Sequence, residues 1–372
     1  MRRAAHRIPV LLCFLAGLSL GLFGTFSISP AEPGQTGMVG VVSMLGATEH
    51  LGKSLARYRV AFVGDSTTMA YGEERKVPDR LQQRLKASVR ASSPLQVFNL
   101  GTPGLGTHDY YFAAGEIARN EPSVLVIALN LACFSDAFIQ RFKRPAFAAL
   151  LSPSQVPEAV GLPIQDIGLT ADRVLLYVGL SARESIFEIW RWLSRNQSAV
   201  QGSHQALAYR LDDAMGHAAT ASLDKALRWE LMAQNNQLEN RYDAVTTRNF
   251  FGIALDGRVG ESDALVMLRA AVQALTDRGV PTLVYVGPVN REHMMEIGVW
   301  NEAGLKQSIQ AIRQAMRDAG GELLDLHDIL PDAGFRDGAG HYTVRGVDGP
   351  ALVADALAPA VAAVLEVQTN GD

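Results

Sequence analysis

The sequence predicts an α/β fold in three layers, an α/β/α sandwich with a mostly parallel five-stranded sheet at its centre. Two observations carry this prediction. Short, continuous apolar runs recur along the chain and alternate with segments that show helical periodicity. Such runs are typical of strands buried on both faces, and their alternation with helices indicates βαβ units. Several of the runs also end abruptly in glycine or polar residues, as strands do where they enter a loop.

The five expected strands are 60–63, 95–100, 124–129, 282–286 and 322–326. Between them, apolar residues recur every three or four positions, as on one face of a helix. The clearest expected helices are 78–89, 262–278, 302–319 and a final helix that ends near 365.

The alternation stops between about residues 141 and 251. Four prolines interrupt the first part, and two amphipathic patterns follow at 181–196 and 222–240. We therefore expect a helical insertion at 141–251 within a domain that spans 58–366. The insertion is expected to lie over the carboxyl edge of the sheet.

The amino-terminal segment has the composition of a membrane anchor. Arg2, Arg3 and Arg7 precede an uncharged apolar stretch from 8 to 29, which is long enough to cross a bilayer. Positive charge before the stretch predicts a cytoplasmic amino end and a domain outside the cytoplasm, on the periplasmic or extracellular face. Residues 1–29 are thus expected to form a signal-anchor helix, and 30–57 a linker. A signal peptide that is cleaved near residue 31 is the alternative.

Composition excludes several classes of protein. The net charge is −4 and no basic block occurs beyond the first residues, which argues against a nucleic-acid partner. The only cysteines are Cys13 and Cys133, so the exported part cannot form an internal disulfide. No zinc-type spacing is present, and the glycines at 101–106 do not have the spacing of a dinucleotide loop. We expect neither a metal nor a cofactor.

The stretch 60–72 combines a buried strand with Gly64-Asp65-Ser66 directly after it. A serine there lies at the carboxyl edge of the sheet, where open α/β folds bind ligands. Serine becomes a nucleophile when a base such as histidine removes its proton. His341 follows Asp337 in the loop before the last helix and is the expected base. His327, beside Asp325 and Asp328, is the alternative.

The segment Gly-Asp-Ser-Thr-Thr at 64–68 resembles the first motif block of the SGNH (GDSL-type) hydrolase superfamily. Partial matches to its later blocks follow in order: the glycine turn at 101–106, Asn130, and Asp337 with His341. The chain departs from the family in two places. Asn130-Leu131-Ala132-Cys133 replaces Gly-x-Asn-Asp, and one additional residue separates Asp337 from His341.

This resemblance implies a flavodoxin-like sheet and an acyl-enzyme mechanism. It implies that Ser66 is the nucleophile, His341 the base and Asp337 the residue that orients the base. The oxyanion hole would consist of the Ser66 and Gly104 N–H groups and the Asn130 side-chain amide.

The resemblance thus leads us to expect a serine ester hydrolase or O-acyltransferase at the cell envelope. By analogy its substrate is an acyl ester, with O-acetyl groups of exported polysaccharide as the leading class. Two alternatives stay open: a lipid or thioester esterase, and a non-catalytic SGNH-like protein that binds a partner through its insertion. A flavodoxin-like cofactor protein is disfavoured, because no phosphate loop is present.

Overall fold

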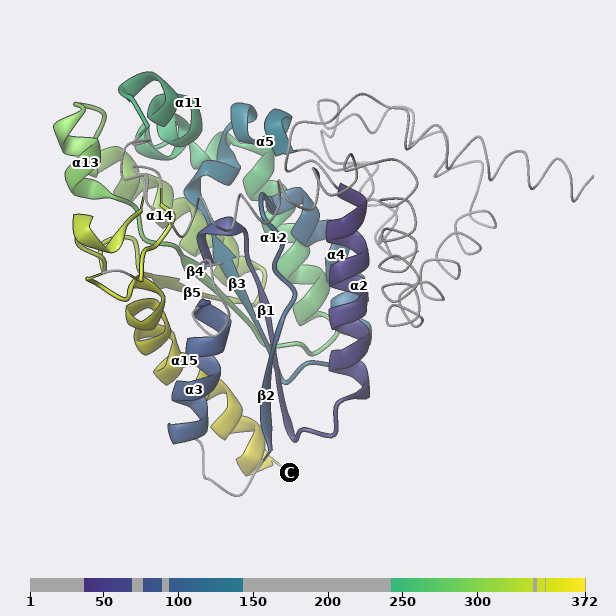
Figure 1. Cartoon of the computed structure of the whole chain (residues 1–372). Helices are drawn as coiled ribbons and strands as arrows, with labels where there is room; N and C mark the ends of the chain where they lie inside the picture. The colour runs from purple at the N-terminus through teal and green to yellow at the C-terminus, as the bar shows by residue number, and fades with distance from the viewer. Residues whose placement is uncertain are drawn as a thin grey trace, which may run out of the picture. The chain divides into compact units, whose positions relative to one another are not determined.

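The computed structural model describes residues 37–68, 76–88, 94–142, 242–336, 340–344 and 346–371. Five strands form one sheet: β1 (Tyr58–Val63), β2 (Leu95–Asn99), β3 (Val124–Leu129), β4 (Thr282–Val286) and β5 (Glu322–Asp325). Their order is β2-β1-β3-β4-β5, and every neighbouring pair is parallel (Figure 1). The strands coincide with the expected ones to within two residues at either end. The predicted parallel five-stranded α/β fold is confirmed.

Helices cover both faces of the sheet, as Figure 1 shows. The helices are α2 (Gly37–Lys53), α3 (Val77–Ser88), α4 (Thr107–Arg119), α5 (Asp136–Phe142), α11 (Ala244–Leu255), α12 (Asp263–Thr276), α13 (Arg291–Glu296), α14 (Glu302–Asp318) and α15 (Gly349–Gly371). The helices α2, α4, α12 and α14 pack on one face, while α3 and α15 pack on the other. This arrangement gives the three layers that the sequence predicts.

The alternation of side chains along β1 divides the core in two. Ala61 and Val63 contact the layer of α4 and α12, whereas Val60 and Phe62 contact the layer of α3 and α15. Successive side chains of a strand point to opposite faces, so a strand between two helical layers must be apolar at every position.

Helix α14 shows how the sequence specifies a surface helix. Asn301 caps its amino end, since the Asn301 side chain accepts a hydrogen bond from the Gly304 N–H at 3.1 Å. Leu305, Ile309 and Ile312 recur at helical spacing and are buried. A side chain in place of Gly304 would put its Cβ 1.9 Å from the Leu255 carbonyl oxygen. Glycine therefore allows α14 to pack closely against α11.

Much of the expected linker at 30–57 is helical, and the linker prediction is wrong over Gly37–Lys53. Met44, Thr48 and Leu51 recur at intervals of four and three residues, and all three are buried, Met44 and Leu51 in the core on the α4 side of the sheet. The glycines and prolines of this segment suggested a loop, but packing against the domain stabilises the helix. The compact unit therefore begins at Gly37 rather than at residue 58.

The predicted insertion at 141–251 falls almost entirely outside the described residues. Its last part does not belong to an insertion, because α11 packs against α14 with Phe250 and Phe251 buried in the core. The two helices expected at 181–196 and 222–240 lie outside the described residues, so the insertion stays a prediction.

The expected anchor at 1–29 also lies outside the described residues. Among those that are described, only the stretch Gly349–Val367 of α15 is long and apolar enough to span a bilayer. One face of this stretch packs against α3, with Val353, Leu357, Val361 and Leu365 fully buried. This packing accounts for its apolar character as that of a core helix.

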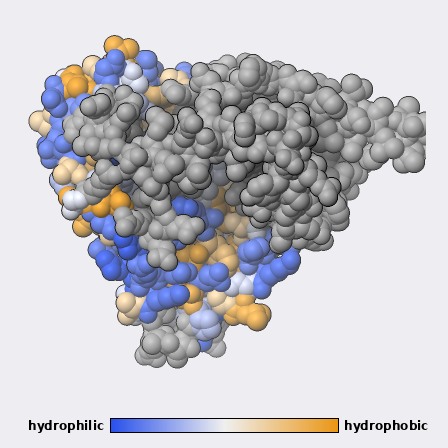
Figure 2. All heavy atoms as spheres, in the orientation of Figure 1, coloured by the Kyte–Doolittle hydropathy of each residue, from blue (hydrophilic) through white to orange (hydrophobic). Residues whose placement is uncertain are grey.

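The large hydrophobic side chains that are exposed on the described part of the chain are scattered. Leu55, Val245, Met295, Leu352 and Val367 belong to different segments. On the face in Figure 2, small hydrophobic groups accordingly lie among hydrophilic side chains.

Candidate active site

The candidate site lies at the carboxyl edge of the sheet, where the loops after the parallel strands meet. Ser66 begins a short 3₁₀ helix (Ser66–Thr68) just after β1, and Asn130 follows β3 directly. The loop that carries His341 precedes α15. This is the edge at which open α/β sheets bind their ligands.

The turn that presents Ser66 is held by the side chain of Asp65. The Thr67 N–H and the Thr67 hydroxyl donate to Asp65 Oδ1 at 2.9 and 2.6 Å. Gly64 is required before it, because a Cβ there would lie 2.8 Å from Thr68 Oγ1 and 2.9 Å from Ala128 Cβ. The apolar strand thus ends in a tight turn that leaves Ser66 half-buried, while Asp65 itself is only 1% exposed.

Ser66 and His341 form a direct hydrogen bond, with Ser66 Oγ 2.9 Å from His341 Nε2. This is the distance at which an imidazole can accept the proton of a serine hydroxyl. The structure therefore brings together the nucleophile and the base that the sequence suggests, from positions 275 residues apart.

The loop around His341 is anchored by backbone contacts on both sides. The Arg336 N–H donates to the His341 carbonyl oxygen at 2.8 Å, and the Thr343 N–H donates to the Gly334 carbonyl oxygen at 2.9 Å. Phe335 and Tyr342 form an antiparallel bridge, and their rings meet edge to face at 6.2 Å. These contacts hold the backbone on both sides of His341 in place. Asp337, the third residue of the expected triad, lies outside the described residues.

Asn130, one of the expected oxyanion residues, is bound to the turn that presents Ser66. Asn130 Nδ2 donates to Asp65 Oδ2 at 2.7 Å, and Asn130 Oδ1 accepts from the Ala132 N–H at 3.0 Å. These two bonds orient the amide and leave one N–H of Nδ2 for another acceptor. Since Oδ1 binds the backbone, the Nδ2 end must face the Ser66 turn.

Gly104 lies in the loop after β2 with φ of +74°, a conformation that favours glycine. The loop is joined to the nucleophile turn, because the Thr102 N–H donates to the Gly64 carbonyl oxygen at 3.0 Å. Gly101 also lies against Gly64, where a Cβ would be 2.8 Å from the Gly64 oxygen.

Cys133 is not a rival nucleophile. It is fully buried, its thiol points to the Leu105 carbonyl oxygen at 3.6 Å, and burial raises its pKa well above the ordinary value. The reactive form of cysteine is the thiolate, which this environment disfavours.

Two further histidines in the described part of the domain lie in different surroundings. His293 Nε2 is 2.9 Å from the Tyr242 carbonyl oxygen. His108 is 1% exposed in α4, with Nε2 3.4 Å from Asp109 Oδ1. Neither hydrogen bonds Ser66.

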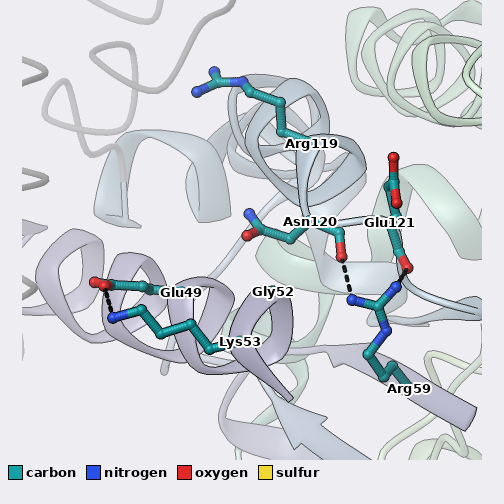
Figure 3. A pocket seen from close by; sticks show the side chains of 7 residues that line it. All are labelled: Glu49, Gly52, Lys53, Arg59, Arg119, Asn120 and Glu121. Atoms are coloured by element: carbon teal, nitrogen blue, oxygen red, sulfur yellow. Dashed lines mark hydrogen bonds and ion pairs between the residues drawn. The ribbon is translucent and has the colours of Figure 1, made fainter. Parts of the chain in front are cut away.

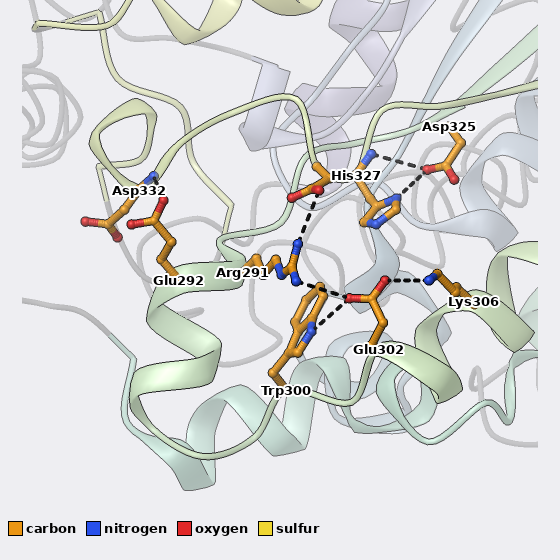
Figure 4. Close-up of polar contacts among 9 residues, drawn as sticks. Arg291, Glu292, Trp300, Glu302, Lys306, Asp325, His327 and Asp332 are labelled. Atoms are coloured by element: carbon orange, nitrogen blue, oxygen red, sulfur yellow. Dashed lines mark hydrogen bonds and ion pairs between the residues drawn. The ribbon is translucent and has the colours of Figure 1, made fainter.

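His327, the alternative base, belongs to a separate polar cluster at the end of β5 (Figure 4). Its Nδ1 is 2.7 Å from Asp325 Oδ1, and this hydrogen bond raises the pKa of His327 above its ordinary value against the effect of burial. Burial acts to raise the pKa of Asp325, but the hydrogen bond and charge of His327 outweigh it and lower that pKa. His327 is thus bound to Asp325, whereas the histidine that bonds Ser66 is His341.

The same cluster continues below His327 in Figure 4. Arg291 lies over the ring of Trp300 at 5.7 Å and reaches Asp328 at 3.5 Å. Glu302 accepts from Trp300 Nε1 at 3.2 Å and pairs with Lys306 at 3.1 Å. The charges are thus compensated within the cluster.

A pocket of about 370 Å³ lies at the opposite end of β1, between α2 and the end of α4 (Figure 3). Arg59 in this pocket donates to the carbonyl oxygens of Asn120 and Glu121, at 3.2 and 2.6 Å. Arg59 therefore caps the carboxyl end of α4, and Lys53 pairs with Glu49. Because Ser66 follows the other end of β1, this pocket is not part of the candidate site.

No sequence feature singled out two residues that the structure places next to Ser66 and His341. The sequence suggested no role for Asp65 itself, but its carboxylate binds the Asn130 amide. Tyr342, which follows His341, is buried, and a Cβ on Gly287 would lie 3.0 Å from its hydroxyl oxygen. Because Asp side chains in turns often bind the backbone N–H two residues on, the sequence could have indicated the contact of Asp65 with the Thr67 N–H, but not the one with Asn130. No sequence signal indicated the burial of Tyr342.

Comparison with protein-family models and with curated proteins gives no match to this chain.

Proposed function

We propose that the chain is a serine ester hydrolase or O-acyltransferase of the SGNH type. The observation that carries this proposal is the 2.9 Å contact between Ser66 Oγ and His341 Nε2 at the carboxyl edge of a parallel sheet. A nucleophile and a base within hydrogen-bond distance are the core of acyl-transfer chemistry.

The reaction proceeds through an acyl-enzyme. Ser66 Oγ attacks the carbonyl carbon of the ester while its proton passes to His341 Nε2. The tetrahedral intermediate collapses, the bond to the alcohol breaks, and His341 protonates the leaving alcohol. Water or a second alcohol then attacks the acyl group, gives its proton to His341, and Ser66 regains its proton as the product leaves.

Three N–H donors are assigned to the oxyanion: those of Ser66, of Gly104 and of the Asn130 amide. The orientation of Asn130 by Asp65 supports its part in this assignment. Loss of one such donor typically lowers the rate about 100-fold to 1000-fold. Asp337 is assigned the role of orienting His341, because it precedes that residue in the same loop.

The substrate class that we propose is an acyl ester at the cell envelope, with O-acetyl groups of exported polysaccharide first. Hydrolysis and transfer share the same acyl-enzyme and differ in whether water or a sugar hydroxyl accepts the acyl group. Incubation with an aryl acetate and a polysaccharide acceptor separates them. Both reactions release the aryl alcohol, but transfer acetylates the polymer whereas hydrolysis yields free acetate.

The proposed location is the outer face of the cytoplasmic membrane, with residues 1–29 as the anchor. Protease added to spheroplasts should cleave the domain while the anchor stays in the membrane fraction. Protection of the domain, or its complete release as a free species, contradicts this location.

A fluorophosphonate probe tests the catalytic proposal, because it labels only an activated serine. We expect labelling of the wild-type chain at Ser66, none in Ser66→Ala, and strongly slowed labelling in His341→Ala. A folded wild-type chain that neither reacts with the probe nor hydrolyses an aryl acetate would instead be a non-catalytic binding protein.

A further inference from the structure

The loop after β2 that carries Gly104 is a tight turn. The Leu105 N–H donates to the Thr102 carbonyl oxygen at 3.2 Å. Pro103 and Gly104 stand between these two residues, and Gly104 has φ of +74°. A proline followed by a residue with positive φ at the two central positions is characteristic of a type II turn. The hydrogen bond of the turn uses the Leu105 N–H, and so it does not engage the Gly104 N–H that we assign to the oxyanion.

Contacts at both ends hold this turn in the site. At its first end the Thr102 N–H donates to the Gly64 carbonyl oxygen at 3.0 Å, close to the turn of Ser66. Just past its other end the Gly106 N–H donates to Asp109 Oδ2 at 3.0 Å. A single contact would let the turn rotate about that point, whereas contacts at both ends fix its direction.

His108, which precedes Asp109 in the first turn of α4, reinforces the second contact. His108 Nε2 lies 3.4 Å from Asp109 Oδ1. The ring also lies against Gly106, since a Cβ there would be 2.8 Å from His108 Cε1 and 3.0 Å from Nδ1. Both side chains are buried, with 1% of His108 and 0% of Asp109 exposed. Gly106 is therefore held between a carboxylate that binds its N–H and a ring that packs against it.

We propose that His108 and Asp109 are positioning residues that fix the end of this turn and thereby aim the Gly104 N–H at the oxyanion. We call these two residues the His108–Asp109 clamp. The inference rests on the proposed function, since it concerns a donor of that same site. Such a donor contributes only when it is aligned, and misplacement of a reacting group by about 1 Å can lower a rate by as much as about 100-fold.

Helix capping alone does not account for the clamp. Asp109 is the third residue of α4 and binds the N–H of the residue before the helix, which is a capping contact. His108 adds nothing to that cap, because neither of its ring nitrogens makes a hydrogen bond within the described part of the chain. A buried polar group without a hydrogen bond lowers stability. Groups that are kept at a cost to stability are expected at functional sites.

Asp243 offers a matched control for the capping contact. It is also an aspartate at the start of a helix, and its Oδ1 accepts from the Thr246 N–H at 2.7 Å at the amino end of α11. Asp243→Ala removes the same kind of contact from a different helix. It should lower the unfolding temperature and leave kcat unchanged.

Gly106 offers a second test, because its backbone does not require glycine. Its φ of −120° is one that alanine adopts without strain. A methyl group at this position is opposed by the ring of His108 at 2.8 Å, and His108→Ala removes that ring. Gly106→Ala should therefore displace the turn in the wild-type background and be tolerated in the His108→Ala background.

The test measures kcat and KM for a small aryl acetate, together with the unfolding temperature, in the full chain. We expect Asp109→Ala and Gly106→Ala to lower kcat about tenfold while KM changes by less than about twofold. Asp109→Asn keeps an oxygen that accepts from the Gly106 N–H and should retain kcat within about threefold of the wild type. Gly106→Ala added to His108→Ala should lower kcat by less than about twofold.

Wild-type kcat in folded Asp109→Ala overturns the inference, and so do equal losses of kcat in Asp109→Ala and Asp243→Ala. A tenfold loss from Gly106→Ala in both backgrounds overturns it as well, because the ring of His108 would then not be the obstacle. If Asp109→Ala does not fold, the comparison of Gly106→Ala in the two backgrounds decides. A wild-type chain without turnover contradicts the proposed function itself, whereas an active wild type with an equally active Asp109→Ala contradicts only the clamp.

Discussion

Ser66 Oγ and His341 Nε2 lie 2.9 Å apart, although 275 positions separate the two residues in the chain. The parallel sheet explains this proximity, because Ser66 follows the carboxyl end of β1 and the loop of His341 opens onto the same edge. The contact turns two isolated sequence features into one candidate reaction centre.

The contact predicts that the two residues act as a unit. Ser66→Ala and His341→Ala should each lower the turnover of an aryl acetate by about 1000-fold or more. The double variant should be little worse than either single variant, because each change already removes the same proton transfer. Losses that multiply in the double variant would show that the two side chains act independently.

His327 should be dispensable for turnover. Its ring is bound to Asp325 at the end of β5 and does not contact Ser66. We expect His327→Gln to keep kcat within about threefold of the wild type, in the same assay in which His341→Gln, its matched control, is nearly inactive. The reverse result would identify His327 as the base.

The Asp325–His327 pair should give stability that depends on pH. The pKa of His327 is raised by folding, so its contribution is fully present below the unfolded value of about 6.5 and is lost as pH rises through the folded value. The pKa of Asp325 is lowered, so its contribution is present above the unfolded value of about 3.9 and is lost as pH falls through the folded value.

The stability difference between wild type and His327→Gln should therefore be widest between about pH 4 and 6.5 and should shrink towards pH 9. Urea unfolding midpoints at pH 6 and pH 9 measure it. Asp325→Asn should produce the same pattern, and the double variant should add little. An equal difference at both pH values excludes the ion pair as its source.

Helix α2 should contribute to the stability of the domain. Leu51 is fully buried, so Leu51→Ala should lower the free energy of unfolding by about 3 kcal/mol. Leu55, which is 98% exposed just after the helix, is the matched control, and Leu55→Ala should change it by less than about 0.5 kcal/mol. Chemical denaturation measures the free energy of unfolding of both variants. Equally small losses in the two variants would mean that α2 contributes little to the stability of the domain.

The sequence by itself determined the sheet. Continuous apolar runs such as Val124–Leu129 identify buried parallel strands, because only a strand covered on both faces is apolar at every position. It also indicated Ser66 and His341 as candidates, because residues 64–68 and the Asp337–His341 loop resemble the first and last motif blocks of the SGNH superfamily. These features depend on the local pattern of residues, which can be read along the chain.

Only the tertiary structure decided what depends on contacts between distant segments. It placed α2 in the core, where Leu51 is buried, although glycine and proline nearby suggested a linker. It paired His341 rather than His327 with Ser66, and joined Asp65 to Asn130. The contacts of Ser66 form where loops meet at the edge of the sheet, and those of Leu51 form in the core. The geometry of both depends on the packing of the whole domain rather than on neighbouring residues.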